Sequence, residues 1–218
     1  MKNIISKSLK DIFSKEVILF VLKIGSISFI ATISFVWYFW DGLSHFIASY
    51  LSWIPWEWLQ TSGAKVITFA SAYMIFIMTV SLLTSLYSEK LLIKLAKKHY
   101  PDVAVVGSVD MMTSILSTLK TSAVFLVLFI LSLPFLFIPF LGQALMLYLW
   151  SILIKEPTTY DVGSLFITDK KEIKNKTKKT RVLAMIASVF NYVPVMNIFS
   201  PIFAQILFLH KILGKVVG

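Results

Sequence analysis

The stretch PFLFIPFLGQ, Pro134 to Gln143, interrupts the longest apolar run of the chain, residues 121–154. A proline removes a backbone N–H and clashes with the preceding helical turn, so Pro134 and Pro139 are expected to end the first arm of this run. At 1.5 Å per residue, the two arms, 121–133 and 143–154, reach only about 20 Å and about 18 Å. A full crossing needs about 20 residues. The stretch therefore predicts a helical hairpin that penetrates only part of a bilayer.

A second apolar run, residues 182–212, repeats this arrangement around a bend that contains Pro194, Asn197 and Pro201. When the bends are aligned, Pro194 matches Pro139 at a distance of 55 residues, and Asn197 matches Gly142. Gly and Asn are also the residues that best tolerate left-handed backbone, so the two positions match in character as well. Either an internal duplication or chance accounts for the match.

The composition is that of an integral membrane protein, because 57% of the 218 residues are hydrophobic, 15% are charged and the mean hydropathy is +0.81. The net charge of +10 favours cytoplasmic anchoring and contact with anionic lipids. Nucleic-acid binding would need a polar domain, which the sequence lacks. The absence of cysteine excludes disulfides, thiolate metal sites and cysteine nucleophiles.

The remaining segments have the patterns of membrane-surface helices, membrane spans and loops. Residues 1–15 have the helical spacing of a basic amphipathic helix at the inner membrane surface. Residues 17–40 and 66–87 are long enough to span the bilayer. After the second of these segments, Leu91, Leu92 and Leu95 share one face of a predicted helix. The basic segment 169–181 is expected to be a cytoplasmic loop, while Trp53, Trp56 and Trp58 mark the outer interface. The whole chain, 1–218, is expected to form one all-α membrane domain with two long transmembrane helices and two partial hairpins that bend at Pro139 and Pro194.

A bend within hydrocarbon leaves backbone groups unpaired, which is tolerated only where protein covers the bend or where it lines a wet path. The bends are therefore expected either to lie in a homo-oligomer or to line a path. Four side chains are candidates for that path: Lys23, Gln143, Asn197 and Arg181. Each also has a plainer explanation, since Lys23 can snorkel to the headgroups, the amides can cap the bends, and Arg181 fits the positive-inside bias.

Catalysis and metal binding are not expected. His45, His99 and His210 are dispersed over three segments without ligand spacing. The sequence also lacks a G-x-S-x-G elbow. We therefore predict neither enzyme activity nor a cofactor or metal ion.

The order of these segments, together with IPFLGQ (138–143) and VPVMNIFSP (193–201), resembles the EI24/CysZ family. YLW (148–150) and, more weakly, TSLYSEKLL (84–92) add to the similarity. The resemblance implies an oligomeric fold with two long spans and two hemi-penetrating hairpins. It also implies a sulfate route through the bacterial inner membrane without ATP hydrolysis. Sulfate permeases of this family carry a glycine-x-arginine element before the first span, where this chain reads FSKEVI (13–18).

Two functions are therefore expected from the sequence. The leading one is a permease or channel for sulfate or a similar small oxyanion. The alternative is a membrane-shaping or scaffold protein that inserts its hairpins as wedges into one leaflet.

Overall fold

The computed structural model describes residues 2–52, 57–136, 138–176, 178 and 180–214, and the regular elements in these ranges are all helical. They are α1 (Lys2–Ile12), α2 (Lys15–Leu51), α3 (Glu57–Tyr87), α4 (Glu89–His99), α5 (Met111–Leu136), α6 (Leu141–Phe166), α7 (Lys170–Lys176), α8 (Arg181–Ser188), the 3₁₀ turns η1 (Val189–Tyr192) and η2 (Met196–Phe199), and α9 (Ser200–Leu213). The chain divides into two units: residues 1–21 with 84–218, and residues 22–83.

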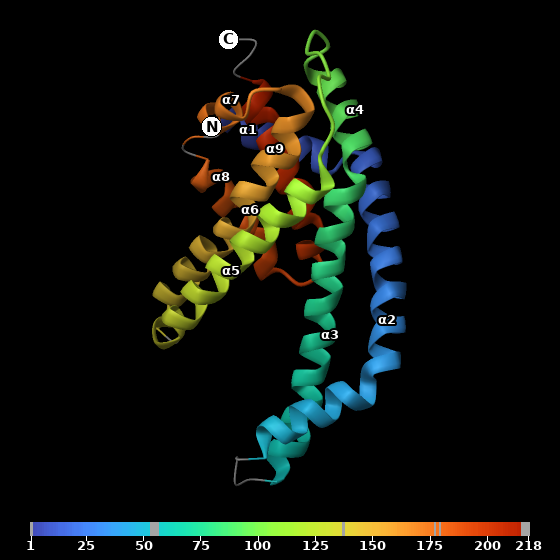
Figure 1. Ribbon diagram of the computed structural model, residues 1–218, viewed down its shortest axis with the longest axis vertical. Helices are drawn as coiled ribbons and strands as arrows, with labels where there is room; N and C mark the ends of the chain where they lie inside the picture. The colour runs from blue at the N-terminus through green and yellow to red at the C-terminus, as the bar shows by residue number, and fades with distance from the viewer. Residues whose placement is uncertain (1, 53–56, 137, 177, 179, 215–218) are drawn as a thin grey trace. The chain divides into compact units, whose positions relative to one another are not determined.

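Helix α9 forms the centre of the first unit, where α1, α4, α6 and α8 contact it (Figure 1). Its side chains from Ile202 to His210 are all buried. A helix that is apolar on every side is stable only when other elements surround it, which explains this central position. Pro201 lies in the first turn of α9, where its missing N–H costs no hydrogen bond.

The amphipathic helices turn one face to this core. Leu91, Leu92 and Leu95 of α4 are buried, so their predicted shared face is confirmed. Helix α1 corresponds to the predicted segment 1–15 and buries Ile12, while Phe13 after its end stays exposed. Contact with α9 therefore occupies one side of α1, and its place on the inner membrane surface stays a prediction.

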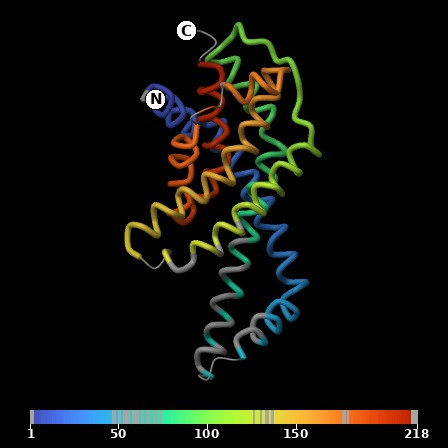
Figure 2. The backbone as a smooth tube through the Cα atoms, turned by 60° about the vertical axis from the view of Figure 1, so that its left-hand side comes forward, coloured from blue at the N-terminus to red at the C-terminus, as the bar shows by residue number. Residues whose placement is uncertain are grey.

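Helices α5 and α6 form the first hairpin and run side by side (Figures 1 and 2). Each has 26 residues, or about 39 Å, so the expectation of two short helices was wrong. Both helices continue past the apolar run, α5 at its start and α6 at its end, where α6 includes Pro157. Pro134 does not end α5, which runs on to Leu136: a proline removes only one N–H, and the two residues after it complete the turn.

The two bends share an unusual backbone geometry. The residue after each aligned proline has a positive φ: Phe140 has φ 63° and ψ −46°, and Val195 has φ 71° and ψ −42°. At the first bend, the N–H of Leu141 donates to the carbonyl of Pro139 at 2.7 Å, which closes a γ-turn around Phe140. The positive φ thus lies directly after each proline, whereas Gly142 and Asn197 do not have one.

A further backbone hydrogen bond recurs at the aligned positions. Gly142 donates its N–H to the carbonyl of Ile138 at 2.8 Å, and Asn197 donates to Val193 at 3.2 Å. The bends are therefore alike in structure as well as in sequence. The arms differ: the second bend lies between α8, which has only eight residues, and α9, with 14. The part of the chain before the second bend is divided into α8 and the tighter 3₁₀ turn η1.

The second unit consists of the later part of α2 and most of α3. Phe29 meets Phe76 edge to face at 6.3 Å between ring centroids, and Trp40 meets Phe69 at 6.0 Å. Trp53 and Trp56, predicted for the outer interface, lie outside the described residues.

The chain is a membrane protein by the length and hydropathy of its helices. Three described stretches are long and apolar enough to cross a bilayer: Lys15–Phe46, Met111–Phe129 and Met196–Leu213. Ile75–Tyr87 and Glu89–His99 form a further candidate that is bent by 59°. The predicted count of two full spans and two partial hairpins differs from this set, and it stays a prediction.

Candidate functional site

A small cavity lies where α5, α6 and the start of α8 meet. Its volume is about 90 Å³, and we call it the basic cavity. It is lined by Lys120, Thr121, Val124, Ile152, Lys155, Glu156 and Arg181. Three cationic side chains thus face one acidic side chain, so the cavity has the positive potential that attracts small anions. The sequence singled out Arg181, and the structure brings it together with Lys120 and Lys155, which were not among the predicted site residues.

Arg181 is held in place by helix α6. Its Nη1 donates to Ser151 Oγ at 3.3 Å, and its guanidinium carbon lies 5.1 Å from the centre of the Tyr148 ring. Arg181 is also the first residue of α8, where a positive charge opposes the helix dipole. Helix stability therefore does not explain an arginine at this position, whereas a charge directed at the basic cavity does.

The two bends are joined by side-chain contacts. The hydroxyl of Tyr192, in the second bend, donates to the backbone carbonyl of Gln143, in the first, at 2.6 Å. The ring of Tyr192 also lies 4.9 Å from that of Trp150. The two segments that the sequence aligned are thus neighbours within one unit, although Tyr192 was not among the predicted residues.

The remaining predicted residues have varied surroundings. Gln143, Pro139 and Pro194 are exposed, whereas Gly142 and Asn197 are buried. Lys23 is exposed on α2, in the second unit.

Asp161 forms a buried polar site in α6 that sequence reasoning missed. Its Oδ2 accepts a hydrogen bond from Ser85 and its Oδ1 one from Ser114, both at 2.7 Å. Burial raises the pKa of Asp161 above its usual value, and the two hydroxyl groups only partly offset this effect. Asp161 therefore ties the end of α3 to the start of α5.

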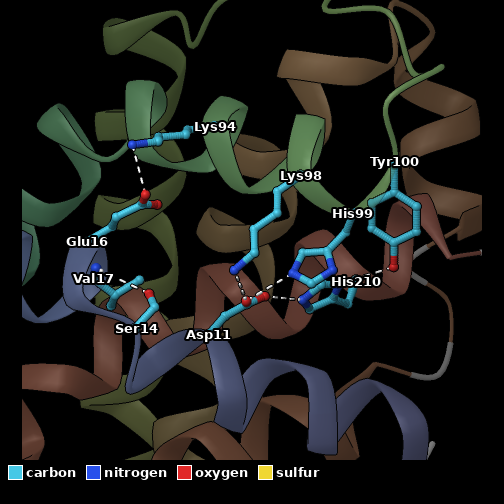
Figure 3. Close-up of polar contacts among 9 residues, drawn as sticks. All are labelled: Asp11, Ser14, Glu16, Val17, Lys94, Lys98, His99, Tyr100 and His210. Carbon is cyan, nitrogen blue, oxygen red and sulfur yellow. Dashed lines mark hydrogen bonds and ion pairs between the residues drawn. The ribbon is translucent and has the colours of Figure 1, made fainter.

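A second missed cluster joins α1, α4 and α9 (Figure 3). Asp11 Oδ1 lies 2.9 Å from His99 Nε2, and Asp11 Oδ2 lies 2.8 Å from His210 Nε2. Burial opposes the ionisation of Asp11, but the hydrogen bonds and charges of the two rings outweigh it, so the pKa of Asp11 is below its usual value. Within the described ranges, this is the one group of three side chains close enough to hold a metal ion.

The expectation that the histidines stay dispersed was wrong for His99 and His210, whose ring centroids are 5.0 Å apart. The three side chains of the cluster come from positions up to 199 residues apart. No local spacing could have indicated such a site. The one available signal is a histidine at a core position of the otherwise apolar helix α9.

The segment 13–18 contains the N-terminus of α2, where side chains of the protein already pair with the helix start (Figure 3). Ser14 Oγ accepts a hydrogen bond from the N–H of Val17 at 3.4 Å, which caps α2. Glu16 pairs with Lys94 at 2.8 Å. Ser14 thus occupies one of the N–H groups that an anion at this helix start would need.

Comparison with known proteins identifies the chain at the family level. Residues 4–201 match the family model described as EI24, sulfate transporter CysZ/etoposide-induced protein 2.4. Neither a curated protein nor a solved structure matches the chain. Because the match covers nearly the whole sequence, from α1 to the start of α9, the chain belongs to the EI24 family, as its two proline bends suggested.

Proposed function

We propose that this protein is a permease or channel for sulfate or a similar small oxyanion, with the basic cavity as the entrance of its path. The observation that carries the proposal is the convergence of Lys120, Lys155 and Arg181 on one cavity. Membership of a family whose description includes a sulfate transporter supports sulfate or a similar oxyanion as the substrate. Anions bind well where several donors converge and where the surrounding protein excludes water.

The path continues from the basic cavity along the paired bends. Gln143 and Asn197 belong to these bends, which the Tyr192 hydrogen bond holds together. Phe140 is 89% exposed and Val195 69% exposed, so each bend presents an apolar residue that needs lipid or protein around it. We propose that a second copy of the chain covers the bends in a homo-oligomer, with the basic segments facing the cytoplasm of a bacterial inner membrane.

Flux measurements with purified protein in liposomes would test this proposal. Arg181→Gln and Lys155→Gln should each lower the flux of labelled sulfate about tenfold, because a hydrogen bond to a charged group is worth about 1.5–3 kcal/mol. Lys171→Gln is the matched control: this lysine is exposed on α7 and does not line the basic cavity. The control should keep the full flux.

Two results would count against the proposal. One is sulfate flux no higher than in empty liposomes when the wild-type protein is folded. The other is equal flux in Arg181→Gln, Lys155→Gln and Lys171→Gln, since the basic cavity would then have no part in permeation.

The second candidate is the membrane-shaping or scaffold function. The observation that favours it is the apolar surface of α5, where Leu116, Leu119, Val127 and Leu131 are exposed. A hairpin with such a surface can insert into one leaflet and expand it. Vesicle tubulation without sulfate flux would support this function in place of transport.

A further inference from the structure

We propose that Asp11, His99 and His210 form a binding site for a divalent transition metal ion of the zinc class, which joins α1, α4 and α9. The site is separate from the basic cavity, with which it shares no residue. It does not depend on the transport function proposed above.

The donor set fits this class of ion. Two imidazole nitrogens and one carboxylate oxygen are common ligands of Zn²⁺, and a water molecule can fill the fourth position. The three ligand atoms all lie within 4.8 Å of one another. A tetrahedral zinc site needs separations of about 3.3 Å between ligand atoms. The side chains therefore have to shift relative to one another before they can surround an ion.

The groups behind the ligands also fit. Tyr100 Oη lies 3.0 Å from Nδ1 of His210 (Figure 3). If Nε2 of His210 binds the ion, the ring proton is on Nδ1, and Nδ1–H can donate a hydrogen bond to Tyr100 Oη. Such an outer partner fixes the ring and its tautomer at many metal sites.

Burial and access suit a bound ion. The side chains of Asp11 and His210 are 2% and 0% exposed, so water competes little for them. The side chain of His99 is 22% exposed, so an ion can reach the site from solvent on this side. Buried charges are stable only when they are paired or hold a metal ion, and Asp11 meets this condition in either state.

Two lysines near the site oppose a cation. Lys98 Nζ lies 3.6 Å from Asp11 Oδ1, and Lys7 lies over the Tyr100 ring at 5.6 Å. The Lys98 side chain is 56% exposed, so it can swing into solvent when an ion arrives. Lys98 therefore distinguishes the two possibilities. A metal ion bound to Asp11 would be repelled by the charge of Lys98, whereas in a purely structural network Lys98 would stabilise Asp11 as an ion-pair partner.

Binding can be measured on the purified full chain in detergent, with ZnCl₂ by titration calorimetry and with Co²⁺ by its visible absorption. We expect one ion per chain and a rise in melting temperature with zinc, because an ion that binds only the folded state stabilises it. His99→Gln should weaken binding about tenfold or more, and Tyr100→Phe should weaken it less. His210→Gln should abolish binding, but this buried residue also supports folding.

Lys98→Ala should tighten zinc binding, because it removes a competing charge beside Asp11. Lys94→Ala is its matched control: Lys94 is on the same helix but pairs with Glu16, so its loss should leave zinc affinity unchanged. His45→Gln, at an exposed histidine of α2, should also bind zinc as the wild type does.

The proposal fails if the wild type binds neither Zn²⁺ nor Co²⁺. It also fails if folded His99→Gln keeps wild-type affinity, or if Lys98→Ala lowers the melting temperature without changing zinc affinity. Such results would leave Asp11 as the centre of a hydrogen-bonded network only.

Discussion

At the scale of single residues, Asp161 shows how a buried carboxyl group makes stability depend on pH. Its pKa is raised, so the folded state holds the proton more tightly than the unfolded state does. The resulting stabilisation is complete below the ordinary value of 3.8 and is lost as the pH rises through the raised pKa. The carboxyl group of Asp161 therefore favours folding more in acid than at neutral pH.

Asp161→Asn should remove this pH dependence. We expect the melting temperature of the wild type, relative to that of the variant, to fall as the pH rises from about 4 to about 7, because the folded state loses its tightly held proton in this range. Tryptophan fluorescence in detergent provides the measurement. Asp102→Asn, in an exposed loop, is the control and should follow the wild-type curve. A constant difference between wild type and Asp161→Asn would contradict the raised pKa.

At the scale of elements, the two bends hold backbone conformations that their side chains disfavour. A positive φ is strained for any residue with a side chain, and most strained for a β-branched one such as Val195. Glycine adopts this conformation without strain. Val195→Gly should therefore keep or raise the melting temperature, although glycine elsewhere lowers it.

Val193→Gly is the matched control, since it is the same change in the same bend at a residue with φ −106°. It should destabilise the protein by about 0.5–1 kcal/mol. Thermal unfolding of both variants gives the comparison. If Val195→Gly loses as much stability as Val193→Gly, the bend does not carry the strain that its backbone indicates.

The contact between the bends can be tested separately. Tyr192→Phe removes the hydroxyl bond to the Gln143 carbonyl but keeps the ring beside Trp150. We expect a loss of about 1 kcal/mol in the free energy of unfolding. Tyr160→Phe is a suitable control, as this half-buried tyrosine of α6 lies outside both bends. Equal stability of wild type and Tyr192→Phe would mean that water replaces the hydroxyl without cost.

The sequence was informative about elements where the signal is local. The spacing of Leu91, Leu92 and Leu95 predicted the buried face of α4, and Pro139 and Pro194 predicted the two bends. It was uninformative where distant segments meet. Asp11 and His99 are 88 residues apart, and nothing near either of them indicates the other. The sequence also did not indicate the positive φ of Phe140, because a bulky side chain disfavours that backbone conformation.

At the scale of the whole molecule, helix length alone does not decide how deeply the first hairpin enters the membrane. Helix α5 has 26 residues, and its stretch Met111–Phe129 is apolar enough to cross. That crossing would bring Lys120 close to the bilayer centre, at a cost of about 2.5–3.5 kcal/mol. If Lys120 stays at the basic cavity near the surface, only the part from Thr121 to Leu136 remains, which is about 24 Å against a core of about 30 Å. We therefore predict a partial hairpin.

Single cysteines can test this topology directly, because the natural chain has none. With a membrane-impermeant maleimide, we expect Ser52→Cys to react in intact cells, and Lys178→Cys to react only after the membrane is opened. Phe140→Cys, at the tip of the hairpin, should react in neither case, because a hairpin of this depth leaves the tip in hydrocarbon. Each variant should react in detergent, which shows that its thiol is competent. Labelling of Phe140→Cys in intact cells would mean that α5 and α6 cross the whole bilayer, and Lys120 would then lie within the membrane as part of the permeation path.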